Sequence, residues 1–366
     1  MRATEVPAAR TRRGLPLNPV LGREIKERMR SARAVAILMG YLGLLAGILY
    51  LAYRGGLLFV RNMGVEGGGA FGSAALGRTM FEWLLFFLLV FVSFIAPGIA
   101  AGAVVGERER RTLHLLQLTL LKPRSIVLGK LGASMAFLVL LVLATAPLFA
   151  VPLVLGGVTP WQVLRGFLVV VALMAFLAAS GTYLSSVARR TQFATVISYA
   201  LTFVVLVGTL FLYGAESIYR SVQRERKVVI CDPGPCEPQG LYRPLSPYLN
   251  PFAAMADAVV DQRAPQFGMG PSPFSMFRGM LGEQFFATPV PMPMPMPMEP
   301  GADGDVRILD GRPGRPGFPD RPHPLLALWT VHIGILLAAS LLFLLLASRR
   351  LRAPARRFVI GRRNEL

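Results

Sequence analysis

Few side chains in this sequence have the types and spacings that could carry out chemistry. Cys231 and Cys236, in the segment CDPGPC, are the only cysteines. In an oxidising compartment they could close a small disulfide loop, which we favour over two free thiols. A run of alternating Met and Pro, VPMPMPMPMEP, covers residues 290–300. Thioethers suit soft copper ions, but low-complexity composition explains this run better, so we predict no metal site.

Two ionisable residues, Glu82 and His332, fall inside long apolar stretches. Such groups can mark a catalytic site or a proton relay when they lie at membrane depth. We expect Glu82 to be close enough to the membrane surface to be solvated, and His332 to hydrogen-bond to a neighbouring helix. No HExxH, nucleophile-elbow or paired Cys–His pattern accompanies them. We therefore predict no catalytic residue, and a proton relay in a secondary transporter is an alternative.

Six apolar stretches must position these residues. The 366 residues are 54% hydrophobic and only 16% charged, whereas soluble domains carry roughly 25% charged residues. Each stretch is long enough to cross a bilayer as a helix, because a span needs about 20 apolar residues. The stretches cover residues 34–53, 80–105, 131–155, 167–187, 193–213 and 325–347. The composition excludes an ordinary soluble protein and predicts an all-α integral membrane protein with six transmembrane helices.

The distribution of charge predicts which way the chain crosses the membrane. The net charge is +19, from 39 basic and 20 acidic residues. If both termini are cytoplasmic, that side carries 24 basic and six acidic residues, and nearly all of the excess charge. Basic loops stay in the cytoplasm. We therefore predict cytoplasmic termini and the cell membrane, with no binding of nucleic acid. The bias towards Arg over Lys is typical of a GC-rich, bacterial genome.

The chain divides at the spans. Residues 1–33 are predicted to be a cytoplasmic tail whose amphipathic helix starts at Asn18-Pro19, with Leu21, Ile25 and Met29 recurring every four residues. This helix would lie on the inner leaflet as an anchor or have a mechanical role. Because this basic tail precedes the first span, we expect that span to be an anchor and not a cleaved signal peptide. A five-span region, 34–213, follows.

The predicted external segment, 214–323, lies before the sixth helix, 324–348, and the basic cytoplasmic tail, 349–366. It holds 19 of the 29 prolines, and we expect its part 288–322 to be largely disordered. Asn250-Pro251 and Ser272-Pro273 each combine an N-cap residue with a first-turn proline. They predict two short amphipathic helices on or dipping into the outer membrane face.

The stretch GERERRTLHLLQLTLLKPRSIVLGK joins the second and third spans, over residues 106–130. It begins with charged residues and becomes apolar at helical spacing from Leu113. This pattern predicts a short amphipathic helix over 106–122 at the cytoplasmic surface. Such a helix could face lipid, or it could present charge and apolar anchors to the groove of a partner.

Residues 18–213 resemble the membrane-spanning permease subunits of type 2 ATP-binding cassette (ABC) exporters. The resemblance rests on NPVLGREIKERMR, on PGIAAGAVVGERERRTLHLLQLTLL and on the following KPRSIVLGKL. It implies a permease that forms the translocation path, and a coupling helix that docks into a separate ATPase. The docking residues that it implies are Glu107, Arg108, Glu109, Thr112, Leu113, Leu116 and Thr119. The resemblance does not extend to the Met-Pro region.

The same resemblance implies an assembly of two permeases, identical or different, with two ATPase subunits in the bilayer. The chain has no GxxxxGK[ST] loop, because Gly129-Lys130 is followed by Leu131 and lacks the upstream glycine. We therefore expect no cofactor on this chain, with ATP and Mg²⁺ used by the partner ATPase. A non-transporting membrane scaffold whose external segment recruits an envelope partner is the other alternative.

Overall fold

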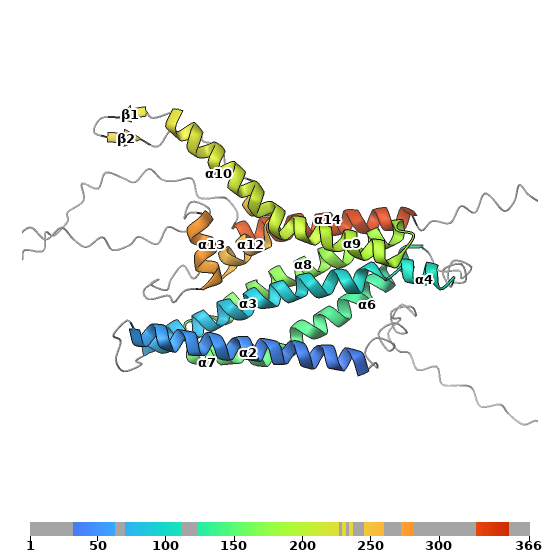
Figure 1. Cartoon of the computed structure of the whole chain (residues 1–366), viewed down its shortest axis with the longest axis horizontal. Coiled ribbons are helices and arrows are strands. Elements are labelled where there is room, and N and C mark those ends of the chain that lie inside the picture. The colour runs from blue at the N-terminus through green and yellow to red at the C-terminus, as the bar shows by residue number, and fades with distance from the viewer. Residues whose placement is uncertain are drawn as a thin grey trace, which may run out of the picture.

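The computed structural model describes residues 32–62, 70–111, 123–226, 229–231, 234–236, 245–259, 272–281 and 327–350. These residues form a bundle of long helices (Figure 1). Six helical segments are long and apolar enough to cross a membrane: Val35–Leu58, Gly72–Glu109, Val127–Leu155, Pro160–Val187, Thr191–Tyr219 and Leu328–Arg350. Each contains most of one predicted span, so the six-span prediction is confirmed.

The spans are built from the following elements. The first is α2 (Ala32–Asn62), the second α3 (Ala70–Ala101) with α4 (Val105–Glu109), and the third α6 (Pro123–Ala144) with α7 (Ala146–Leu155). The fourth is α8 (Pro160–Val187), and the fifth joins α9 (Thr191–Phe203), the π-helix η1 (Val204–Gly208) and α10 (Thr209–Arg226). Three short helices, α11 (Ser246–Leu249), α12 (Pro251–Ala258) and α13 (Pro273–Leu281), precede the sixth span, α14 (Leu328–Arg350).

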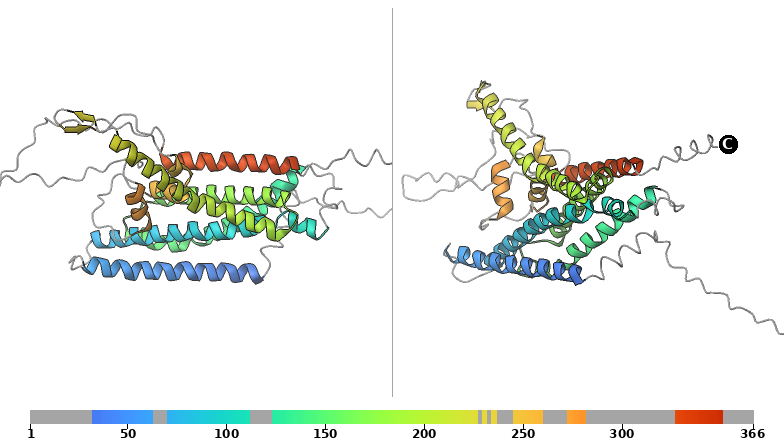
Figure 2. Two further views of the ribbon diagram at one scale, coloured as in Figure 1. Left: turned by 45° about the horizontal axis from the view of Figure 1, so that its top comes forward. Right: turned by 45° about the vertical axis from the view of Figure 1, so that its right-hand side comes forward.

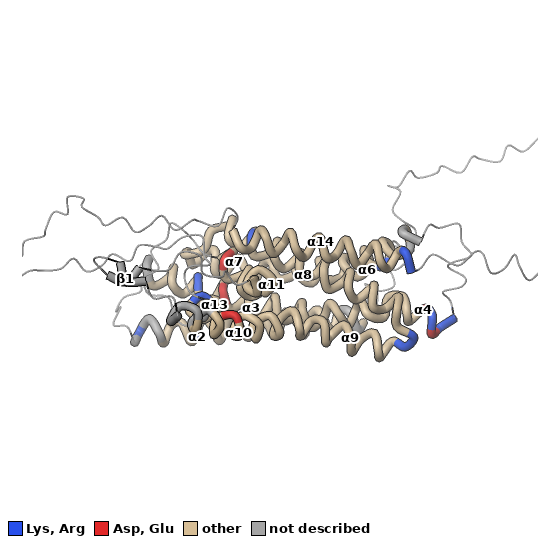
Figure 3. The backbone as a smooth tube through the Cα atoms, turned by 90° about the horizontal axis from the view of Figure 1, so that it is seen from above, with Lys and Arg blue, Asp and Glu red and all other residues tan. Residues whose placement is uncertain are grey.

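The centre of the bundle is α8, which packs against α3 and α14, while α2 packs on α3 at one edge. The bundle has two distinct ends (Figures 1 and 2). We call them the α4 end, where α2 and α6 begin and α14 finishes, and the α12 end, where α12 and α13 lie. Charged residues gather at these ends and leave a long uncharged middle (Figure 3). The first and last described helices thus have their outer termini at one end, as six spans require; that this end is cytoplasmic stays a prediction.

The outward faces of the spans are apolar. Met39 and Leu51 on α2 are 65% and 68% exposed, and Val154 on α7 and Phe211 on α10 are 87% and 75% exposed. Large aliphatic and aromatic side chains exposed in such numbers along a bundle would be costly in water. In a bilayer they contact lipid, so the outer surface agrees with the hydropathy of the spans.

One close contact fixes the α12 end of α3. Gly157, in the turn between α7 and α8, has a φ of +75°, and a Cβ there would collide with the Ala74 carbonyl oxygen. A Cβ on Gly77 would likewise collide with the Gly156 carbonyl oxygen. Glycine is required because the backbone of α3 passes directly against the backbone of this turn.

The helix α12 begins as predicted but lies deeper. The Asn250 side-chain oxygen accepts hydrogen bonds from the backbone N–H groups of Phe252 and Ala253, at 2.8 and 3.1 Å. All eight residues of α12 are buried, and the helix packs against α8, α13 and α14. The helix is therefore enclosed by protein and has no exposed amphipathic face, because its small alanines allow close packing. Whether it lies on or dips into the outer membrane face stays a prediction. The start of α13 at Pro273 is confirmed.

Asn250 also reaches the π-helix in the fifth span. Its amide nitrogen donates to the Leu206 carbonyl at 3.1 Å and to the Thr209 hydroxyl at 2.7 Å. Segments of π-helix disturb the regular backbone ladder, so an external donor at this point stabilises the irregular turn. One side chain thus caps α12 and fixes the fifth span beside it.

We expect Asn250→Ala to lower the free energy of unfolding by about 2–4 kcal/mol, because it removes a helix cap and leaves buried groups unpaired. Thermal denaturation of the purified protein in detergent measures this loss. Asn250→Ser is the matched control, since its hydroxyl keeps an N-cap acceptor without adding charge and loses the amide donor, and it should show an intermediate loss. Equal stability of the alanine variant and the wild type would contradict the prediction.

Two groups of predictions are left open by the structure. The cysteines lie on a small antiparallel hairpin, β1 (Val229–Cys231) and β2 (Gly234–Cys236), in which Cys231 is opposite Gly234. The structure describes only the backbone there, so the disulfide stays a prediction. Residues 288–322 and the tail positions Leu21, Ile25 and Met29 lie outside the described residues.

Candidate functional site

The link between the second and third spans begins with a short helix of its own. After α3 ends, a turn leads into α4, whose last residue is Glu109. Arg111 has a φ of +59°, a left-handed conformation that cannot continue an α-helix. The prediction of one helix over 106–122 is therefore wrong at its start. Thr112, Leu113, Leu116 and Thr119 lie outside the described residues.

The start of α4 is held by α8. The Ser185 hydroxyl oxygen accepts hydrogen bonds from the backbone N–H groups of Val104 and Val105, at 3.0 and 2.9 Å. The first N–H groups of a helix have no partner within the helix and need one elsewhere. Ser185 is fully buried, so the two amides are bonded away from water. The direction of α4 is thereby set by the fourth span.

Arg108 holds the end of the fourth span. Its two terminal guanidinium nitrogens donate to the backbone carbonyls of Ala188 and Ser186, at 2.7 and 3.1 Å. The last carbonyls of a helix are unpaired and carry partial negative charge, so a guanidinium group is a favourable partner for them. Arg108 thus caps the C-terminus of α8, although it lies 80 residues earlier in the chain.

Glu109 holds the start of the fifth span in the same way. Its carboxylate accepts from the Thr191 backbone N–H at 2.7 Å and from the Thr191 hydroxyl at 2.6 Å. The residue at the N-cap position of α9, Arg190, makes no side-chain cap. Glu109 supplies that cap instead, and its negative charge suits the positive end of the helix dipole.

Glu107 reaches the third span. Its carboxylate lies 2.7 Å from the ammonium nitrogen of Lys130 on α6, and Lys130 is 2% exposed. Three consecutive side chains therefore hold three different spans. We call Glu107, Arg108, Glu109 and their partners the α4 junction. Of the predicted docking residues, these three make contacts within the chain, whereas their neighbours Arg110 and Arg111 are exposed.

Apolar contacts extend the α4 junction to the sixth span. Val104 packs in one buried cluster with Val127 of α6 and Ala347 of α14. Val105 packs in another with Ala188 and Ala194, on either side of the turn between α8 and α9. The five-residue helix α4 is thus joined to the third, fourth and fifth spans, and the residue before it to the sixth.

A second charged site lies at the α12 end. Glu82 on α3 is fully buried. Its carboxylate accepts from Arg78 at 3.2 Å and from Arg278 of α13 at 3.3 Å, and the Ser272 hydroxyl also donates to it. The expectation that Glu82 is solvated is wrong, because α13 covers it. We call Arg78, Glu82, Ser272 and Arg278 the Glu82 cluster.

Attraction between the charges of the Glu82 cluster offsets part of the cost of burying them. Burial lowers the pKa of Arg278 below its usual value, and the neighbouring Glu82 carboxylate shifts that pKa back upwards. Spacing could have indicated the bond between Arg78 and Glu82, which lie four residues apart on one helix. The partners on α13 are about 190 residues away in the sequence, and no local signal indicates them.

Residues 72–349 match the model of a family described as ABC-2 family transporter protein. The chain belongs to this family. The match runs from the second span to the sixth and so contains both the α4 junction and the Glu82 cluster. A comparison with curated proteins found no match.

Membership of the ABC-2 family confirms the resemblance to type 2 permease subunits. It makes the chain a multi-pass membrane protein and the membrane component of an ABC transporter, and it implies association with an ABC ATPase. The resemblance had rested on residues 18–213, whereas the family match reaches the sixth span. The matched range includes the residues of α12 and α13.

Two further polar side chains of this ABC-2 protein, those of His332 and Arg165, contact neighbouring helices. The His332 ring nitrogen Nδ1 lies 2.9 Å from the Tyr248 carbonyl oxygen, as the sequence predicted for this histidine. The Arg165 guanidinium lies between the rings of Trp161 and Trp329, 5.3 and 5.6 Å from their centres, a cation–π arrangement that the sequence did not indicate. Within the described ranges, no group of three or more His, Cys, Asp or Glu could hold a metal ion.

Proposed function

We propose that this chain is the permease subunit of an ABC exporter in a bacterial cell membrane, and that the α4 junction passes motion of the ATPase to the spans. The observation that carries the proposal is the division of contacts among Glu107, Arg108 and Glu109, each of which holds a different span. A loop that only connected two helices would not need to cap two others.

The proposal divides the link between the second and third spans into two parts. Exposed Arg110 and Arg111, with Thr112, Leu113, Leu116 and Thr119, would contact the groove of the ATPase. The α4 junction would then transmit the displacement. Because α4 is bonded to α6, α8 and α9 together, a push on it shifts several spans at once.

The rest of the assembly follows from the family and the charge pattern. We propose two permease chains, identical or different, with two ATPase subunits that bind ATP and Mg²⁺ at the α4 end. The basic excess at that end, which includes Arg189, Arg190, Arg349 and Arg350, supports a cytoplasmic location. Export is the direction that the resemblance implies.

Leu116→Arg tests the docking part of the proposal. We expect it to reduce co-purification of the ATPase from membranes at least tenfold, because about 1.4 kcal/mol of lost contact gives a factor of ten. Leu245→Arg is the matched control, since Leu245 is 64% exposed at the α12 end, and it should co-purify the ATPase as the wild type does. Unchanged co-purification by a membrane-inserted Leu116→Arg variant would contradict the assignment.

A further inference from the structure

Arg165 is a charged residue on the lipid-facing side of the fourth span. It lies on the second turn of α8 at the α12 end, four residues after Trp161 and three before Leu168. Residues at these spacings share one face of a helix, and Trp161 and Leu168 are 53% and 42% exposed. The 28 residues of α8 extend over about 42 Å, beyond a hydrocarbon core of about 30 Å. Arg165 therefore lies near the lipid headgroups of the leaflet at this end.

Two indole rings hold the Arg165 guanidinium group in place. Its central carbon lies 5.3 Å from the ring centre of Trp161 and 5.6 Å from that of Trp329, within the range of cation–π contacts. The backbone at both rings is fixed by other contacts. The helix α8 begins at the Thr159 cap, and the Trp329 backbone N–H donates to the Asp257 carboxylate at 3.1 Å. The guanidinium group therefore links the start of α8 to the start of α14 in a preorganised position.

The Arg165 guanidinium group lacks an anionic partner among the described residues. In that part of the chain its side chain makes no hydrogen bond or ion pair, and its Nε atom is buried without an acceptor. The Asp257 carboxylate, which accepts from Trp329, forms no ion pair with it. The side chain is only partly buried, so its two terminal nitrogens are open to a ligand. A cation at membrane depth is costly without a partner, and these two nitrogens can donate to two oxygens of one phosphate.

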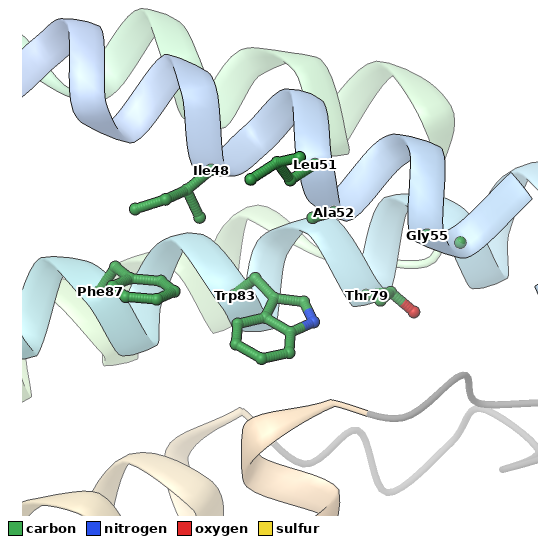
Figure 4. Close-up of a pocket in the computed structure, with 8 residues that line it drawn as sticks. Ile48, Leu51, Ala52, Gly55, Thr79, Trp83 and Phe87 are labelled. Atoms are coloured by element: carbon green, nitrogen blue, oxygen red, sulfur yellow. The ribbon is translucent and has the colours of Figure 1, made fainter.

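An apolar groove between α2 and α3 offers lipid a different kind of contact. It has a volume of about 370 Å³ and is lined by Thr79, Trp83 and Phe87, among others (Figure 4). None of the described residues that line it is charged. The Thr79 hydroxyl already donates to the Ala75 carbonyl at 3.0 Å. A lipid in this groove would be held by its hydrocarbon alone, whereas Arg165 selects a phosphate.

We propose that Arg165, with Trp161 and Trp329, binds the phosphate of one glycerophospholipid from the leaflet at the α12 end. The guanidinium group donates to two phosphate oxygens, and the two rings hold its plane in position. The acyl chains lie along the exposed face of α8, which continues through Leu168 and Val171. The bound lipid stabilises the contact between the fourth and sixth spans, and this role is independent of ATPase docking at the α4 end.

Native mass spectrometry of the full-length protein in detergent tests this site. With phosphatidylglycerol added, we expect one lipid to be retained per chain, and Arg165→Gln to weaken retention about tenfold, through loss of a charge-assisted contact. Trp161→Leu should also weaken it, because the guanidinium group then loses one of its two rings. Arg61→Gln is the matched control. Arg61 is an exposed arginine in the last turn of α2 at the same end, but it stacks on no ring among the described residues, so its loss should change nothing.

Three outcomes would overturn the proposal. Equal retention by Arg165→Gln and the wild type would exclude the phosphate contact. Displacement of the lipid by inorganic phosphate would show a site for free anions. Retention of a phosphate-free diacylglycerol glycolipid as strong as that of phosphatidylglycerol, with retention lost in Trp83→Ala, would place the lipid in the apolar groove. Co-purification of the ATPase reports separately on the proposed function.

The effect of lipid on thermal stability separates binding from a purely structural role. Phosphatidylglycerol should raise the melting temperature of the wild type by several degrees and that of Arg165→Gln by much less, since a ligand stabilises the state that binds it. Comparing each variant with and without lipid removes any loss that the substitution causes in the protein alone. Arg165→Lys keeps the charge but not the planar group that stacks on the two rings, so it should show an intermediate rise. Equal rises in the wild type and Arg165→Gln would contradict the proposal.

Discussion

Glu82→Gln should destabilise this permease strongly, by about 3–5 kcal/mol. The variant keeps the shape of the side chain and can keep a hydrogen bond to the Ser272 hydroxyl, but it removes the carboxylate that contacts both Arg78 and Arg278. Two guanidinium groups would then be buried without this counter-charge. Thermal denaturation in detergent, followed by size-exclusion chromatography, measures the loss.

A double-mutant cycle shows whether the loss arises from charge. Glu82→Gln with Arg278→Gln restores the formal charge of the cluster to +1, so the double variant should be less destabilised than the sum of the two single variants. Additive losses would show that Glu82 and Arg278 act independently. A wild-type melting temperature for Glu82→Gln alone would contradict the account of the cluster.

The sequence predicted the spans well because hydropathy is a local property. Each apolar stretch is long enough to be recognised as a span from its own residues. The helices α12 and α13 begin at the predicted Asn-Pro and Ser-Pro pairs. Burial was harder to predict. Glu82 looked accessible because its position along α3 is near the end of the span, and only the packing of α13 against α3 removes it from water.

The contacts of the charged residues in the α4 junction were also hard to predict from the sequence. The resemblance selected Glu107, Arg108 and Glu109 as residues of interest but assigned them to contacts with a partner. Within the chain they contact Lys130, the carbonyls that end α8, and Thr191 at the start of α9. These partners lie 23 to 82 residues away in the sequence. Such pairings depend on how three spans meet, which helical spacing in one segment cannot reveal.

The two charged sites are joined by one helix. The Glu82 cluster lies at the α12 end of α3, and α4 continues from its other end. Between them, Pro97 cannot donate to the Ser93 carbonyl, so α3 bends most easily near that point. The Tyr199 hydroxyl of α9 donates to the Phe94 carbonyl there, at 2.9 Å. Motion of α4 would therefore reach α3 and α9 together.

Arg108→Ala should uncouple the permease from its ATPase. The substitution leaves the last carbonyls of α8 without their guanidinium partner, at a cost of about 1.5–3 kcal/mol for hydrogen bonds to a charged group. If this contact forms in only one of the two conformations of the permease, a loss of that size alters the equilibrium between them at least tenfold. The ATPase should still co-purify and hydrolyse ATP, because the exposed docking residues are unchanged.

Hydrogen–deuterium exchange can measure this loss of coupling, and the measurement does not require the transported substrate to be known. In the wild-type complex, trapping with ATP and vanadate should change exchange in α12 and α13; in Arg108→Ala that difference should fall about tenfold, in proportion to the lost coupling. Arg108→Lys keeps the charge but not the two-pronged geometry, so it should be intermediate. Arg350→Ala, which removes an exposed arginine at the same end, should keep the full difference. If Arg108→Ala also kept the full difference in exchange, the α4 junction would only stabilise the fold. Motion of the ATPase would then have to reach the spans through another contact.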